Sequence, residues 1–139
     1  MHAPAFSIFS AVSELFVTAA VLYLVRRNWT GRGFSLPLFI AVALFEACVN
    51  VAYMANRASS AAAGREPIAA GMKIFYALHG MLSLLAFLWF VVLAVFAWQE
   101  QRAGRSFFRA RPVLTWAFVI VWLVSVLSGE TLFALRYLL

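Results

Sequence analysis

The sequence predicts an all-α fold, a polytopic membrane protein whose four transmembrane helices form an up-down bundle. Of its 139 residues, 65% are hydrophobic and only 12% are charged, whereas soluble domains carry about 25% charged residues. The hydrophobic residues form four stretches, each with the roughly 20 residues that a helix needs to cross a bilayer. Because unpaired backbone groups are costly in lipid, each stretch is expected to be a helix.

The four predicted spans leave little chain over, so residues 1–139 are expected to form a single transmembrane domain. Pro37 falls in the first turn of the second span, where its missing N–H is tolerated. The segment 57–67 is small, polar and rich in turn-forming residues, which predicts a loop. The spans cover about residues 4–25, 34–56, 68–99 and 113–139.

The net charge of +6 is spread over short loops, which indicates contact with the lipid bilayer and its headgroups and not with nucleic acid. Ten arginines against one lysine, with abundant alanine, are typical of a GC-rich bacterial genome. The positive-inside rule then predicts a bacterial inner-membrane protein with cytoplasmic first and third loops and periplasmic termini. The first and third loops hold Arg26, Arg27, Arg32, Arg102, Arg105, Arg109 and Arg111, against Arg57, Arg65, Lys73 and Arg136 on the other side.

Polar residues inside the spans are the most informative feature of the sequence. All five acidic residues are glutamates, and Glu14, Glu46 and Glu130 fall within spans. A charge at the bilayer centre costs roughly 3 kcal/mol on insertion scales, so these residues are expected to face protein or water, or to be protonated. Asn50 and His79 also lie within spans. At the helical rise, all five lie roughly 10–16 Å from the outer ends of their helices, which predicts one polar layer.

Further polar residues extend this layer along the helix faces, because residues three and four apart are neighbours on a helix. Small residues nearby are expected to let the helices approach closely. The polar stripes are Ser7, Ser10, Glu14 and Thr18; Glu46, Asn50, Tyr53 and Arg57; and Tyr76, His79 and Ser83. The small residues are Gly80, Ser83 and the run at 125–129.

Three interpretations of the layer stay open. Its members could form interhelical hydrogen bonds worth about 1 kcal/mol each, hold a transition metal or a haem, or carry protons or cations through the three glutamates. A haem held by two histidines of one chain does not fit, because His79 is the only histidine in a span and His2 is terminal. No nucleophile-elbow, zinc-protease or phosphate-loop motif is present, so no catalytic residue is assigned and a non-enzymatic role is favoured.

Four segments, spread over roughly residues 38–138, carry a resemblance to a known family. They are VAYMANR at 51–57, MKIFYALH at 72–79, RAGRSFFRARP at 102–112 and WLVSVLSGETLFALRYLL at 122–139. In this order they resemble the YozB/CtaM family of small four-helix bacterial membrane proteins, which look like accessory or maturation factors for haem-copper cytochrome oxidases. Family members carry histidines in the first and third loops, where this chain has Arg32 and the pair Phe107 and Phe108.

The resemblance implies a non-catalytic accessory subunit or assembly factor of a respiratory complex. Its partner would be a larger membrane protein complex or a second copy of the chain. One alternative is a metal- or haem-binding redox component that uses His79 with Glu14, Glu46 or Glu130. Another is a proton-coupled small transporter, because small multidrug transporters also have four helices and a glutamate in the first, like Glu14.

Overall fold

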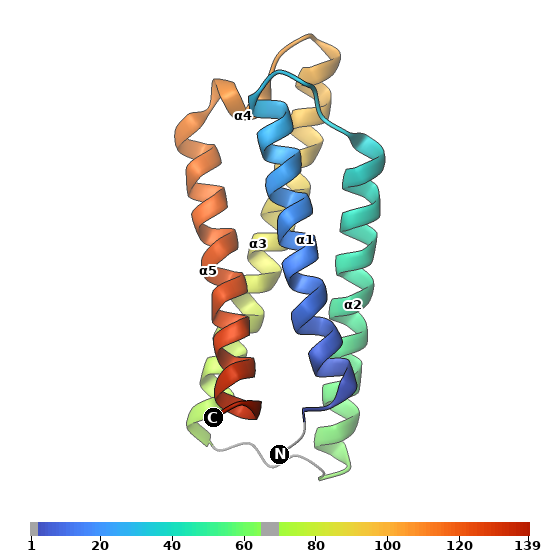
Figure 1. The fold of residues 1–139 in the computed structure, drawn as a ribbon, viewed down its shortest axis with the longest axis vertical. Helices are drawn as coiled ribbons and strands as arrows, with labels where there is room; N and C mark the ends of the chain where they lie inside the picture. The colour runs from blue at the N-terminus through green and yellow to red at the C-terminus, as the bar shows by residue number, and fades with distance from the viewer. Residues whose placement is uncertain (1–2, 65–69) are drawn as a thin grey trace.

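The computed structural model is an up-down bundle of four long helices (Figure 1). It describes residues 3–64 and 70–139, and these contain no strand. Each long helix is long and apolar enough to cross a membrane, which confirms the predicted fold class. The helices are α1 (Ala5–Trp29), α2 (Leu36–Ala62), α3 (Ala70–Arg102) and α5 (Pro112–Tyr137), with a single turn of helix, α4 (Phe107–Ala110), before α5.

The helices differ in how many neighbours they have. α1 packs closely against α2 and α5, and α5 packs closely against α1 and α3. α2 packs along α1 and touches α3 only lightly. The connections after α1 and after α3 meet at one end of the bundle, which we call the closed end, and the two chain termini lie at the other end (Figure 1).

α2 extends beyond the span that hydropathy predicts for it. It ends at Ala62 and not near residue 56, so the loop prediction is wrong for residues 57–62. These residues are mostly alanine, serine and arginine, which helices tolerate well. The hydroxyl of Ser59 donates to the carbonyl of Ala55, one turn earlier in the helix, at 3.0 Å. The rest of the predicted loop, with Arg65, and the start of the third span at residue 68 lie outside the described residues.

The predicted basic loop at 100–112 is a packed structure in part. α4 buries Phe107 and Phe108 between α1, α3 and α5. The buried amide of Asn28, near the end of α1, accepts the backbone N–H of Phe108 at 3.0 Å. Thr115 of α5 donates to the carbonyl of Phe108 at 2.9 Å. Both backbone groups of this buried residue are therefore satisfied, as buried groups require.

Polar contacts also fasten the connection between α1 and α2 to α3. The side-chain carbonyl of Gln101 accepts the backbone N–H of Phe34, which is buried beneath it. Gly33 has a φ of +82°, and a Cβ there would lie 3.2 Å from the Gln101 carbonyl oxygen. Glu100 pairs with Arg111 at 2.7 Å across the same end. Polar contacts from the α1–α2 connection and from the α3–α5 connection therefore both stabilise the closed end.

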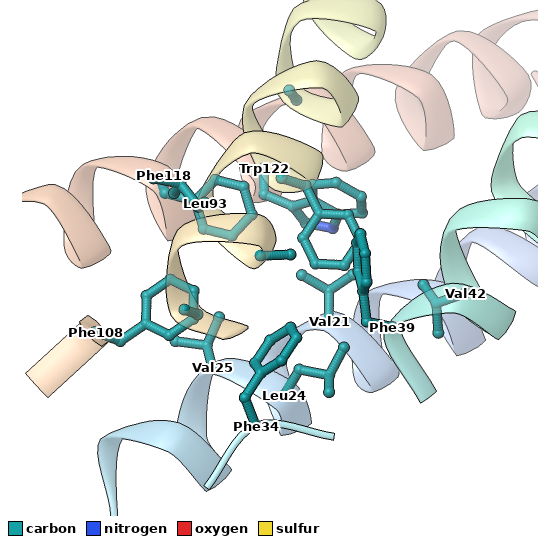
Figure 2. Packing of buried hydrophobic residues seen from close by; sticks show 14 of the residues in the cluster. Val21, Leu24, Val25, Phe34, Phe39, Val42, Leu93, Phe108, Phe118 and Trp122 are labelled. Carbon is teal, nitrogen blue, oxygen red and sulfur yellow. The ribbon is translucent and has the colours of Figure 1, made fainter. Parts of the chain in front are cut away.

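The apolar core fills the half of the bundle next to the closed end. At its centre Phe90 packs edge-on against Phe39 and Trp122, with ring centroids 5.4 and 5.5 Å apart, and stacks on Phe118 at 6.2 Å. Figure 2 shows how side chains from all four long helices and the first connection meet there. The largest members of this core are Leu24, Phe34, Phe39, Phe90, Leu93, Phe107, Phe108, Phe118 and Trp122.

Replacement of the central phenylalanine should destabilise the bundle. Phe90 is 1% exposed and Phe16 is 73% exposed. Lipid tails are as apolar as a leucine side chain, so Phe90→Ala mainly creates a cavity, and we expect a loss of about 2 kcal/mol in unfolding free energy. Phe16→Ala removes the same atoms from the lipid-facing surface and should leave stability unchanged. Reversible unfolding in mixed micelles measures both, and equal losses would contradict this description of the core.

Candidate functional site

Glu14 and Glu46 face the same small space where the aromatic core ends. Glu14 comes from α1 and the buried Glu46 from α2, and they approach closely enough for their charges to interact. Glu130 of α5 also acts electrostatically on Glu14. The structure therefore brings two of the three predicted glutamates, Glu14 and Glu46, to one small space, which Glu130 does not line. The remaining residues around this space are Ser83, Ala86, Trp122, Ser125 and Val126, and they leave no room for a water molecule.

Asn50 supports Glu46 from one turn along α2. Its side-chain amide donates to Oε1 of Glu46 at 2.7 Å and to the backbone carbonyl of Glu46 at 2.9 Å. A buried carboxyl group without a donor would be costly in a medium of low polarity. The hydrogen bonds from Asn50 therefore lower the free-energy cost of burying Glu46. Their spacing on one face of α2 agrees with the polar stripe that the sequence predicts there. Trp122 adds a neighbouring contact between helices, since its indole N–H donates to Thr18 of α1 at 3.2 Å.

His79 bonds to α5 and does not line the space between Glu14 and Glu46. Its Nδ1 lies 2.8 Å from the hydroxyl of Ser128. That hydroxyl in turn lies 2.6 Å from the carbonyl of Ser125, to which it donates. A Cβ at Gly129 would lie 2.8 Å from Cε1 of His79, so the imidazole occupies space that only glycine leaves free.

The side chains that could ligate a metal are not gathered at one place among the described residues. Within residues 3–64 and 70–139, no three side chains of histidine, cysteine, aspartate or glutamate come together to hold a metal ion. His79 and the glutamates therefore do not form a shared chelating site. A haem would have one described histidine, His79, because His2 lies outside the described residues.

Tyr53, Arg57 and Tyr76 form a separate cluster nearer the termini. Arg57 of α2 donates to the hydroxyl of Tyr53 at 3.1 Å. Its guanidinium carbon also lies 4.2 Å from the ring centroid of Tyr76 on α3, a cation–π distance. Arg136 of α5 donates to the hydroxyl of Tyr76 at 3.3 Å. This cluster links α2 to α5 through Tyr76 of α3, and α2 otherwise touches α3 only lightly.

Several residues of the site are absent from the sequence-based candidates. Ser128 and Ser125, which hold His79, belong to a run for which the sequence predicts only close helix approach. That prediction describes Gly129 correctly. It is wrong for Gly80, where a Cβ would meet nothing within 4 Å, because this residue faces away from the other helices. The run of small residues next to a buried tryptophan is the signal that points to this part of α5.

Comparison with protein-family models, curated proteins and solved structures finds no match to this chain. The resemblance to the YozB/CtaM family therefore stays a prediction from the sequence.

Substitution of Gly129 should separate α3 from α5. In Gly129→Ala the new methyl group would meet the imidazole of His79 at 2.8 Å, so we expect a loss of about 1–3 kcal/mol in unfolding free energy. Gly80→Ala adds the same group in open space and should be neutral or slightly stabilising, since alanine favours helix. Adding His79→Ala to Gly129→Ala should restore part of the loss, and a strictly additive double variant would contradict the contact.

The acidic neighbourhood should tolerate neutralisation of Glu14. Two nearby carboxylates in a poorly polar interior repel each other, and no hydrogen bond from Glu14 is formed among the described residues. We therefore expect Glu14→Gln to unfold at the same temperature as the parent chain or at a higher one. Glu46→Leu, which removes the acceptor of Asn50, should unfold at a lower temperature. Thermal unfolding in detergent measures both, and a large loss in Glu14→Gln would show that its charge is needed.

Proposed function

We propose that this chain is a non-catalytic membrane subunit or assembly factor that works bound to a larger membrane complex. The complex suggested by the resemblance is a respiratory one of the haem-copper cytochrome oxidase type. The proposed location is the bacterial inner membrane. The arginine-rich closed end would lie in the cytoplasm and both termini in the periplasm, as the positive-inside rule favours.

The observation that carries this proposal is the incomplete packing of α2. Of its 27 residues only Phe39, Val42 and Glu46 are buried, whereas α1 buries eight residues over a similar length. α2 is held mainly through α1 and touches α3 lightly. A helix with one close neighbour has an apolar flank that another membrane protein can cover, and helices in lipid associate through such close packing.

The polar residues in the spans give less support to the alternative functions. Glu14 and Glu46 enclose no room for water, so this packing provides no aqueous route for a transported ion. The described residues do not gather three ligands for a metal. Asn50 bonds to Glu46 and Ser128 to His79. These contacts support a structural role for the layer, in keeping with a subunit that does no chemistry of its own.

Site-specific photo-crosslinking in native membranes tests the proposal. A crosslinker in place of Val51, on the side of α2 away from its buried residues, should yield an adduct with another membrane protein. We expect mass spectrometry to identify that protein as a subunit of a cytochrome oxidase. The matched control is Leu127 of α5, because it is 64% exposed and Val51 is 68% exposed.

The control position should give adducts with lipid and little else. If Val51 forms adducts only with a second copy of this chain, the partner of α2 is another copy of the chain and the oxidase proposal is wrong. Adducts with lipid at both positions would overturn the proposal that α2 binds a protein partner.

A further inference from the structure

An apolar groove lies between the first half of α3 and the second half of α5, at the end of the bundle opposite the closed end. Its volume of about 360 Å³ lies within the range of small-molecule sites, which is about 300–1,000 Å³. Its lining on α3 covers residues 72–82, so the groove is about 15 Å long. Phe75 and Leu78 of this lining are exposed on the lipid-facing surface. The groove is therefore large enough for a small molecule and is open on its lipid-facing side.

His79 lines this groove with a defined arrangement of protons. A serine hydroxyl has one hydrogen, and Ser128 uses it on the carbonyl of Ser125 at 2.6 Å. The oxygen of Ser128 can then only accept from Nδ1 of His79, 2.8 Å away. The neutral imidazole therefore carries its proton on Nδ1 and has a lone pair on Nε2. No described residue donates to Nε2.

The hydroxyl group of Thr131, which also lines the groove, likewise uses its hydrogen in a bond to the backbone. Thr131 donates to the carbonyl of Leu127 at 2.7 Å, so its oxygen can only accept from a ligand. The groove thus offers hydrogen-bond acceptors and no free donors. His79 lies nine residues into α3, about 14 Å from the start of the helix. Acyl chains carry no hydrogen-bond donor at that depth, so an ordinary phospholipid leaves Nε2 unpaired.

We propose that this groove binds a hydroquinone of the isoprenoid type, which donates one phenolic O–H to Nε2 of His79. A hydroquinone is a flat aromatic diol with an apolar tail, so it is soluble in the membrane and brings a donor to the required depth. Its ring would pack against Phe75 and its tail along the leucines of the groove. This is a binding site for a small molecule, and it does not depend on whether α2 binds a protein partner.

The same geometry makes the site selective for the reduced form. The oxygens of a quinone only accept hydrogen bonds, so one of them would face the lone pair of Nε2. Binding a quinone would require the proton to move to Nε2 and the hydroxyl of Ser128 to turn away from Ser125. The hydrogen bond lost in that rearrangement corresponds to about a five-fold weaker affinity.

Partitioning between nanodiscs with and without the full chain tests this inference under anaerobic conditions. The probes are a decyl-substituted benzohydroquinone, the corresponding benzoquinone and decanol. We expect the hydroquinone to bind about five-fold more tightly than the quinone. His79→Phe, which keeps an aromatic ring in the groove, should lower hydroquinone affinity to that of the quinone. Equal affinities in the parent chain, or decanol binding as tightly as the hydroquinone, would overturn the assignment.

A matched pair of substitutions locates the site independently of His79. Leu78 and Leu84 of α3 are both 57% exposed, and only Leu78 lines the groove. Leu78→Trp should fill the groove and abolish binding of both probes, and Leu84→Trp should change neither affinity. Unchanged binding in Leu78→Trp would exclude the groove as the site. Because the chain is tested alone, this result is separate from the crosslinking result for α2.

Discussion

The buried amide of Asn28 is the contact on which the arrangement of the helices depends. It accepts the backbone N–H of Phe108 at 3.0 Å, while Thr115 satisfies the carbonyl of the same residue. With both groups bonded, the chain can bury Phe107 and Phe108 at the end of the bundle without leaving polar backbone unpaired. The Asn28 contact joins the end of α1 to α4, and the Thr115 contact joins α4 to α5, beside the aromatic core.

From the closed end toward the termini, the residues between the helices change from aromatic to polar. The aromatic core comes first, centred on Phe90, and the acidic neighbourhood of Glu14 and Glu46 follows where the core ends. Nearer the termini, hydrogen bonds such as that of His79 with Ser128 join α3 to α5, and an apolar groove lies between these two helices. Rigid packing and ligand-sized space thus occupy different halves of one small domain.

Hydropathy predicts the four helices and their up-down order because lipid requires long apolar segments with internally bonded backbones. It predicts the end of α2 poorly, because alanine, serine and arginine continue a helix as readily outside the membrane as within it. Depth along each helix was enough to group Glu14 with Glu46. Depth does not report rotation about the helix axis, so the pairing of His79 with Ser128 and the outward direction of Gly80 needed the tertiary structure.

The polar contacts of α1 also constrain how the chain is made. Asn28 is bonded to a residue 80 positions later in the chain, and Thr18 to one 104 positions later. During synthesis α1 enters the membrane well before either partner exists, with these side chains and Glu14 on one face. An unpaired polar face is costly in lipid, so α1 has to be sheltered until α5 arrives. Biogenesis of this protein therefore favours late release from the insertion machinery, with α1 retained until the last helix is complete.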